Sequence, residues 1–383
     1  MRPSELPSQS FSGPRTFASP CRATAEPGAT SPKVTAMNAA YLHVVPDEPT
    51  PAAGTAIGRI SRVHRGECDV LTAEGELRVE LASSVRAIAA QDPQYSPTVG
   101  DLCVLQLGGT SPRLIDLLPR RTAVTRAAVS PGSSHRQVLA ANVDILAAVE
   151  PLNTAPTIGR IERLLALGWE SGAAPVVLLS KCDLDPDPQG WVREVSMAAP
   201  GAPVIAVSQR DGSGIEELRA LLGPGRVLGL VGPSGAGKSS LVNALAGESV
   251  MDTAEIRQDG KGRHTTVHRE LVVLPDGSLI IDTPGLRSVG LASPEALEMV
   301  FADVTTFAES CRFNDCAHVT EPGCGIQQAI ENGDLAQRRL ESWRKLQREA
   351  AYQERRTNVR LRAAERELWK QRTKQMRQGG YRP

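Results

Sequence analysis

The stretch Val227-Leu-Gly-Leu-Val-Gly-Pro-Ser-Gly-Ala-Gly-Lys-Ser239 decides the fold of this chain. Its first part, Val227–Val231, is apolar and predicts a buried strand, and the residues of Ser239–Ala246 predict a helix. Between the two, Gly232–Ser239 is a complete G-x-x-x-x-G-K-[ST] string in the strand-to-helix context that identifies a phosphate-binding loop. The sequence therefore predicts a P-loop at this place.

The residue types of this loop are those that phosphate chemistry requires. Gly235 and Gly237 let backbone N–H groups converge on phosphate oxygens, and the helix N-terminus adds a partial positive charge. Lys238 is expected to reach the β- and γ-phosphates as a catalytic group, and the Ser239 hydroxyl to ligate Mg²⁺. We expect nucleotide contacts along the whole loop: Gly232, Pro233, Ser234, Gly235, Ala236, Gly237, Lys238, Ser239 and Ser240.

A second strand, Leu279–Ile281, leads into Asp282-Thr-Pro-Gly285, a D-x-x-G string. Beside a P-loop, Asp282 can hold the Mg²⁺ shell, and the Gly285 amide can sense the γ-phosphate. The string indicates a nucleotide switch, while the choice of base depends on another part of the chain.

The base is predicted by Ser180-Lys-Cys-Asp183, a K-x-D string after the apolar run Val176–Leu179. Its carboxylate can accept from the N1 and N2 donors that guanine has and adenine lacks, while the Lys181 stem lies along the base. A later loop supplies a backbone donor to the guanine oxygen. The predicted guanine-binding set is Ser180, Lys181, Cys182, Asp183 and Ser208.

The order of these elements is unusual. In ordinary small GTPases the P-loop comes first and the base-reading residues come last, whereas here Asp183 and Ser208 precede the P-loop. The sequence therefore predicts a circularly permuted GTPase. In this order the switch after Gly285 runs directly into the C-terminal segment, so that loss of γ-phosphate contacts can move that segment.

The segment between the P-loop and the D-x-x-G string is the expected first switch. Thr265 or Thr266 is predicted to ligate Mg²⁺ when GTP is bound. Leu286 occupies the place where Ras-like enzymes have a water-orienting Gln, and it cannot orient water by hydrogen bonding. His264 is the nearest polar candidate for that catalytic task, and a group supplied by a partner is the rival.

A metal site is predicted further along the chain. Three thiols and one imidazole fall within fourteen residues: Cys311, Cys316, His318 and Cys324. Four such ligands form a closed tetrahedral site, which is the arrangement of structural zinc. The remaining cysteines show no ligand spacing, and the lack of a signal peptide favours a reducing cytoplasm over a disulfide framework.

The sequence before the P-loop domain predicts a small barrel. Short alternating runs predict strands at 56–63, 67–72, 76–81, 102–107 and 114–117. This pattern fits an OB-type barrel and does not exclude an SH3-like one. From Val138 to Leu291 strands alternate with helices, which predicts a mostly parallel sheet, and from Pro294 the pattern is helical.

The fold class is thus multidomain α/β. The predicted divisions are a disordered extension at 1–45, an OB-like β-barrel at 46–125, a circularly permuted GTPase domain at 126–292, a zinc-binding helical domain at 293–350 and a basic C-terminal helix or tail at 351–383. The extension is Pro- and Ser-rich, and Met37 could also begin the chain.

The formal net charge of zero hides an asymmetry. The 383 residues hold 43 basic and 43 acidic side chains, but Leu335–Pro383 holds fifteen basic and five acidic ones, a net of +10. The rest of the chain is therefore at −10. A basic segment of this kind favours binding to a polyanion such as RNA. No apolar run is long enough to span a membrane.

Together these motifs resemble the RsgA (YjeQ) family of small-subunit-dependent ribosomal GTPases. The supporting strings are Asn142-Val-Asp144, Gly232–Ser240, Gly262–Thr266, Asp282–Gly285 and Cys311–Cys324. The resemblance implies GTP hydrolysis stimulated by the small (30S) ribosomal subunit during its late maturation, with contacts to 16S rRNA. The implied cofactors are GTP or GDP, Mg²⁺ and one structural Zn²⁺, in a cytoplasmic, monomeric protein.

Two residues depart from the family pattern. Ser180 stands where the family usually has Asn, and Gln209 where Ala usually follows the Ser208 position. We expect the first change to weaken guanine affinity without changing the base. Two alternatives to the GTPase remain open: an RNA-binding adaptor with nucleotide as a structural ligand, and a P-loop ATPase or kinase.

Overall fold

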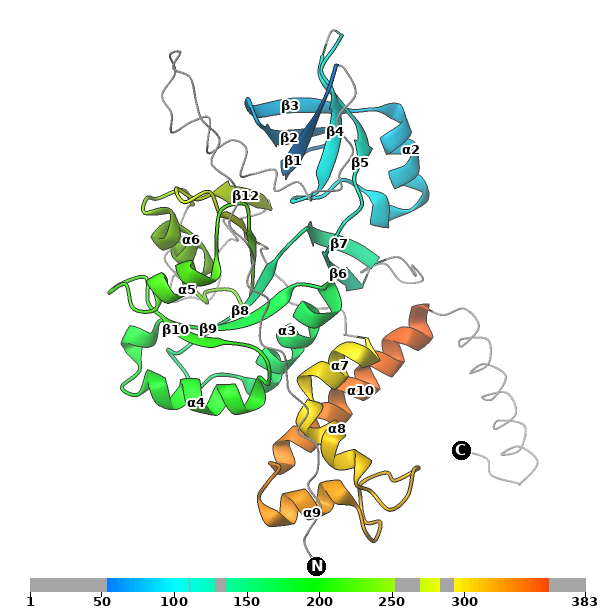
Figure 1. The fold of residues 1–383 in the computed structure, drawn as a ribbon, viewed down its shortest axis with the longest axis vertical. Coiled ribbons are helices and arrows are strands. Elements are labelled where there is room, and N and C mark those ends of the chain that lie inside the picture. Colours follow the sequence, from blue (N-terminus) through cyan, green and yellow to red (C-terminus); the bar gives the residue numbers. More distant parts are fainter. Residues whose placement is uncertain (1–53, 110, 128–135, 252–268, 283–292, 358–383) are drawn as a thin grey trace, which may run out of the picture.

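The computed structural model describes residues 54–109, 111–127, 136–251, 269–282 and 293–357 (Figure 1). Some predicted features lie outside this part of the chain: the extension at 1–45, the tail beyond Thr357, Cys21, His264, Thr265, Thr266, Gly285 and Leu286. Within the described residues, no helix combines the length and apolarity needed to cross a membrane.

The N-terminal unit is the predicted small barrel. Its five strands close in the order β1-β2-β3-β5-β4. They are β1 (Thr55–Val63), β2 (Glu67–Thr72), β3 (Gly75–Leu81), β4 (Leu102–Gln106) and β5 (Arg113–Leu117). Antiparallel pairing of β1 with β4 and parallel pairing of β3 with β5 close an OB-like barrel. Ile60, Val70 and Leu105 pack in its core.

Two elements next to the barrel were not predicted. Helix α2 (Ser83–Gln91) lies between β3 and β4, and a hairpin of β6 (Ala123–Ala127) and β7 (Arg136–Ala141) leads into the next domain. In α2 only Val85 is buried, so the helix lacks the apolar stripe by which a helix is recognised in sequence. Val138, the predicted start of the α/β pattern, lies instead in the hairpin.

The central domain has a six-stranded sheet of order β10-β9-β8-β11-β13-β12. Its strands are β8 (Ile145–Pro151), β9 (Ala174–Ser180), β10 (Val204–Val207), β11 (Val227–Val231), β12 (Glu270–Val273) and β13 (Leu279–Asp282). All neighbours are parallel except β12, which runs antiparallel to β13. The mostly parallel sheet is confirmed, with β8 beginning at Ile145.

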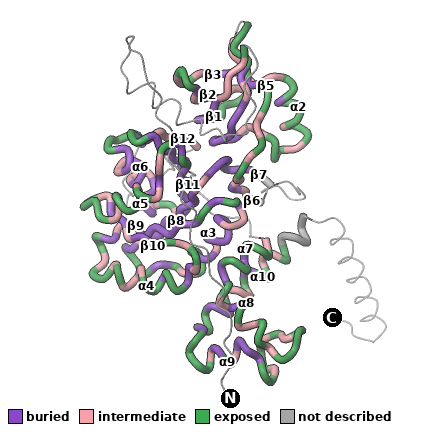
Figure 2. The backbone as a smooth tube through the Cα atoms, viewed as in Figure 1, coloured by how far each residue is buried: buried purple, intermediate pink, exposed green. Residues whose placement is uncertain are grey.

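Helices cover both faces of this sheet. They are α3 (Ile158–Ser171), α4 (Pro188–Ala198), α5 (Ile215–Leu221) and α6 (Lys238–Ala246). Successive residues of β9 alternate between the faces: Val176 and Leu178 pack in one apolar cluster with α5 and α6, while Val177 and Leu179 pack in another with α3 and α4. Figure 2 shows this layer of strands as the buried centre of the domain.

The C-terminal part is helical, as predicted. Its helices are α7 (Pro294–Val300), α8 (Ala302–Glu309), α9 (Gly325–Asn332) and α10 (Gln337–Thr357). Leu340 and Leu346 of α10 are buried, and Trp343 and Ala350 pack against the same cluster, so these residues form an apolar stripe along the helix. That cluster also contains residues of α3, so these helices share a core with the central domain.

Candidate nucleotide site and metal centre

The P-loop connects β11 to α6 through three glycines with positive φ. Gly232, Gly235 and Gly237 have φ of 156°, 78° and 82°. At Gly232 a Cβ would lie 2.3 Å from the Val149 carbonyl oxygen on the neighbouring strand, so no other residue fits there. The loop therefore takes a conformation that exposes backbone N–H groups at the start of a helix, as anion binding requires.

Lys238 is folded into this loop. Its Nζ donates to the carbonyl oxygens of Gly232 at 3.0 Å and of Pro233 at 2.9 Å. Desolvation lowers the pKa of Lys238, while the nearby Asp282 carboxylate opposes that shift. A desolvated ammonium next to backbone N–H groups is suited to binding phosphate oxygens.

A pair of oxygen ligands lies beside the loop. Because β11 and β13 are neighbours, Asp282 comes next to the start of α6, and the Ser239 hydroxyl donates to its Oδ2 at 3.3 Å. The other carboxylate oxygen, Oδ1, is buried and has no hydrogen-bond partner among the described residues. Desolvation raises the pKa of Asp282, partly offset by Lys238 and Ser239. An unpaired buried carboxylate oxygen beside a hydroxyl fits Mg²⁺, which prefers hard oxygen ligands.

The residues predicted to read the base come together at the ends of β9 and β10. The Ser208 hydroxyl, fully buried, donates to Asp183 Oδ1 at 2.8 Å. Lys181 adopts a left-handed conformation with φ of 59°, which turns the chain at the end of β9. Arg210, which the sequence did not single out, has Nη1 4.0 Å from Asp183 Oδ2. Its only sequence signal is its place two residues after Ser208.

Ser180 joins the base-reading residues to the P-loop. Its side chain is buried, and its hydroxyl donates to the Ala236 carbonyl oxygen at 2.7 Å. The two residues are 56 positions apart, and β9 and β11 flank β8 in the sheet. The neighbouring Cys182 is also buried, and desolvation raises the pKa of its thiol.

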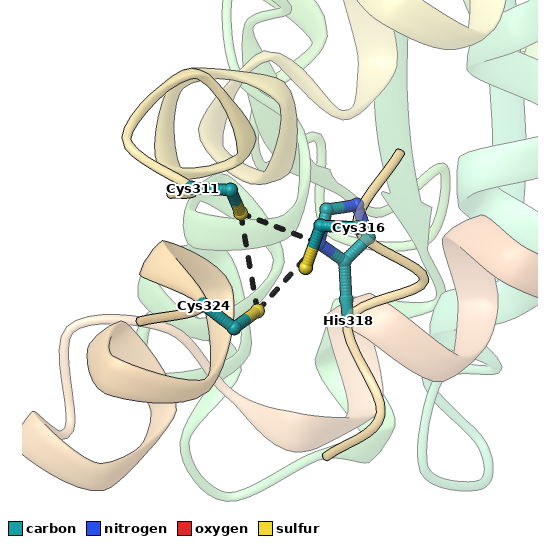
Figure 3. Close-up of side chains that lie close together, drawn as sticks. All are labelled: Cys311, Cys316, His318 and Cys324. Carbon is teal, nitrogen blue, oxygen red and sulfur yellow. Dashed lines mark hydrogen bonds between the residues drawn. The ribbon is translucent and has the colours of Figure 1, made fainter. Parts of the chain in front are cut away.

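The four predicted metal ligands also converge (Figure 3). Their ligand atoms all lie within 4.8 Å of one another. Cys311 Sγ is 3.4 Å from His318 Nδ1 and 3.9 Å from Cys324 Sγ, and Cys324 Sγ is 3.6 Å from the same nitrogen. A tetrahedral Zn²⁺ with Zn–S of about 2.3 Å and Zn–N of about 2.0 Å would hold such atoms about 3.5–3.8 Å apart. The donor set and its spacing therefore fit zinc.

Side-chain hydrogen bonds to its backbone hold the loop that carries these ligands. Glu321 accepts from the N–H groups of Ala317, Val319 and Thr320, at 3.0, 2.8 and 3.0 Å. Arg344 of α10 donates to the His318 carbonyl oxygen at 2.8 Å. These contacts allow His318 to take a left-handed φ of 60°, which directs its ring towards the cysteines.

The electrostatics at the cluster favour a bound cation. Desolvation, then the neighbouring thiols, raise the pKa of Cys316 to about 11, although a backbone hydrogen bond opposes this. Desolvation lowers the pKa of His318, as does Arg344, so its imidazole stays neutral. Three thiols this close can be ionised together only when a cation neutralises them.

The central domain matches a known protein family. A family model described as RsgA GTPase matches residues 117–292. A second model, described as ABC transporter, matches residues 215–379, a range that contains the P-loop but neither Asp183 nor Ser208.

Curated relatives match most of the chain. A protein named small ribosomal subunit biogenesis GTPase RsgA, from Streptomyces coelicolor, is 47% identical over 329 residues, which cover 85% of this chain and 88% of the relative. A protein of the same name from Methanosarcina acetivorans is 38% identical over 318 residues, covering 82% and 85%.

Solved structures agree with the relatives. The crystal structure of YjeQ from Thermotoga maritima is 28% identical with a TM-score of 0.56, and the match covers 78% of this chain and 99% of that one. A structure described as YloQ, a circularly permuted GTPase, has a TM-score of 0.54 at 21% identity, covers 78% and 96%, and shows the same fold.

Proposed function

This chain belongs to the RsgA family of P-loop GTP hydrolases, and on that premise we propose that it uses GTP binding and hydrolysis to time its residence on the maturing small ribosomal subunit. Its relatives are named for the biogenesis of that subunit. The observation that supports the proposal most is the convergence of guanine-reading and phosphate-binding residues at one edge of the sheet, through the Ser180–Ala236 hydrogen bond.

The residues at this edge have distinct tasks in the proposed reaction. Lys238 and the P-loop N–H groups bind the phosphates and stabilise charge on the γ-phosphate. Ser239 and Asp282 would hold Mg²⁺, which neutralises phosphate charge when bound. Asp183, positioned by Ser208, accepts from the guanine N1 and N2 donors. Thr265 or Thr266 is proposed as a further Mg²⁺ ligand, the Gly285 amide as a γ-phosphate contact and His264 as the group that positions water.

The base-reading assignment is tested with Asp183→Ala. Losing two charge-assisted hydrogen bonds should reduce the preference for GTP over ATP by about 100-fold. Equilibrium binding of both nucleotides measures this, with Glu194→Ala, an exposed carboxylate on α4, as the control. An unchanged preference in Asp183→Ala would favour the P-loop ATPase or kinase.

The ribosomal assignment is tested by GTP turnover with and without small subunits. We expect subunits to stimulate the wild type. Binding of GTP without any stimulation would favour the RNA-binding adaptor. In the same assay His264→Ala should be slower, and equal rates would assign water positioning to another group.

We also propose that Cys311, Cys316, His318 and Cys324 hold one structural zinc ion. With all four ligands from the protein, no coordination position is left for catalysis. The ion would therefore stabilise the loop between α8 and α9. The sequence spacing and the closeness of the four ligand atoms support this assignment.

The partner of the basic C-terminal segment is proposed to be 16S rRNA. After Ala351 the segment holds ten basic and three acidic residues, a net of +7, which would neutralise phosphates without reading sequence. Truncation after Ala351 should weaken RNA binding and flatten its dependence on salt concentration, measured in a titration series. An unchanged slope would contradict this. We propose that the protein acts in the cytoplasm as a monomer.

A further inference from the structure

Gln209 lies between the base-reading residues and the P-loop. It follows Ser208 at the end of β10, and its carboxamide lies against Gly237, the N-cap of α6. A Cβ on that glycine would be 3.4 Å from Gln209 Nε2 and 3.8 Å from Oε1. The side chain therefore reaches back over the phosphate-binding loop.

The backbone around Gln209 is held on both sides. The Ser208 N–H donates to the Ser213 carbonyl oxygen at 2.9 Å, and the Arg210 N–H donates to Ser208 Oγ at 3.1 Å. The carboxamide itself is different, since its Oε1 is buried and accepts no hydrogen bond from any residue that the structure describes. A buried unpaired amide oxygen is costly, and rotation of the amide exchanges its oxygen with its NH₂ group. Such a group is suited to pairing with a ligand.

Guanine has an edge to which neither Ser180 nor Asp183 offers a side-chain donor. It presents the acceptors O6 and N7. Ser180 already uses its hydroxyl proton on the Ala236 carbonyl oxygen, and Asp183 can only accept when ionised. Gln209 lies next to Gly237, the P-loop residue that follows Ala236, and its carboxamide has two N–H donors.

From this geometry we infer that Gln209 is a specificity-determining residue that donates from Nε2 to the O6/N7 edge of guanine. This role would explain the two departures from the family pattern, Ser180 and Gln209, together. Ser180 lacks the carboxamide of Asn but retains a bond to the P-loop, and Gln209 supplies a carboxamide one P-loop residue further on. The inference rests on the proposed guanine site.

The test is a binding cycle with altered bases. Kd is measured for GDP, for 7-deaza-GDP, which lacks N7, and for 2-aminopurine riboside diphosphate, which lacks O6 and the N1 proton, so that on each nucleotide the variant is compared with the wild type. The proteins are the wild type, Gln209→Met, which keeps the bulk and loses the donor, and Gln209→Ala. Gln189→Ala, an exposed glutamine on α4, is the control.

We expect both Gln209 variants to bind GDP roughly 5- to 10-fold more weakly, the range for one net hydrogen bond. With the analogue that lacks the contacted acceptor, the difference from the wild type should disappear. Equal loss on all three nucleotides, or no loss on GDP, would overturn the inference. Absence of GDP binding by the wild type would instead overturn the proposed function.

Discussion

At the scale of single residues, the hydrogen bond of Ser180 shows how one hydroxyl can hold two motifs together. We predict that Ser180→Ala lowers the free energy of unfolding by about 1–2 kcal/mol, because the buried Ala236 carbonyl oxygen loses its side-chain donor. GDP affinity should fall with it, because the P-loop loses its contact with β9. Denaturant titration and GDP binding measure the two effects.

The control for Ser180 is Ser196→Ala. The Ser196 hydroxyl donates to a carbonyl oxygen of its own helix on the exposed side of α4, so we expect a change below about 0.5 kcal/mol. Equal effects at the two serines would mean that the Ser180 bond has no special role.

A second residue-scale prediction concerns acid stability of the barrel. Hydrogen bonding from Arg78, and from His64 after it, lowers the pKa of Asp69 to about 2, against the opposing effect of burial. A lowered pKa stabilises the fold above the unfolded-state value of about 4, and this contribution is lost as pH falls towards 2. Asp69→Asn should therefore cost about 1–2 kcal/mol at neutral pH and progressively less below about pH 4.

Denaturation midpoints of the wild type and Asp69→Asn across this pH range measure the effect. Glu80→Gln is the control, because its carboxylate lies 3.9 Å from Arg113 with both side chains more than half exposed. Exposed pairs contribute little. A constant difference between wild type and Asp69→Asn down to pH 2 would refute the assignment.

At the scale of elements, the metal-binding loop between α8 and α9 carries a prediction about zinc. Purified protein should contain about one zinc per chain, and Cys316→Ser should lose it. Removal of the ion by a chelator should also lower the thermal midpoint, because the loop contributes few buried apolar groups of its own. Elemental analysis and thermal melts measure both.

Cys68→Ala is the matched control for the zinc prediction. Cys68 is a buried barrel thiol that lies outside the cluster of metal-ligating side chains in the described residues. Its zinc content should equal that of the wild type. A wild-type protein that binds no zinc would contradict the proposed metal site.

At the scale of the whole molecule, buried charges join the C-terminal helices to the central domain. Arg339 of α10 donates to Glu162 of α3 at 2.8 Å and to Asp303 of α8 at 2.8 Å through a different nitrogen. It also lies over the Phe301 ring at 4.6 Å. Both Arg339 and Glu162 are buried.

We predict that Arg339→Met destabilises the protein by about 3 kcal/mol, because Asp303 loses its ion-pair partner and the buried Glu162 keeps only Arg338 and Ser342. Increased proteolysis of the C-terminal helices should accompany the loss. Arg193→Met is the control, since its pair with Asp187 is exposed on both sides. Similar denaturation midpoints for the two variants would contradict a role of Arg339 in holding the domains.

A partly exposed ion pair connects the barrel to a strand beside the nucleotide site. Arg62 of β1 forms an ion pair with Glu270 of β12. In the sheet register Glu270 lies opposite Asp282, the proposed Mg²⁺ residue of β13. The ion pair therefore connects the barrel to the strand that lies beside the proposed Mg²⁺ residue.

The sequence by itself determined the motifs of this protein and most of its strands. The P-loop at Gly232–Ser239 is recognisable because phosphate binding fixes residue types at short spacing, and the proposed zinc ligands are recognisable for the same reason. Apolar runs such as Val227–Val231 identify buried strands, because those strands are covered on both faces.

The motifs predicted that Ser180, Asp183 and Ser208 share one site, but only the tertiary structure decided which atoms bond to one another. The bonds from Ser208 to Asp183, from Ser180 to Ala236 and from Arg339 to Glu162 join residues 25, 56 and 177 positions apart. The position of Gln209 over Gly237 belongs to the same class. Local patterns carry no information about such pairs, because the order of strands in the sheet, and not the order of residues in the chain, sets the distance between them.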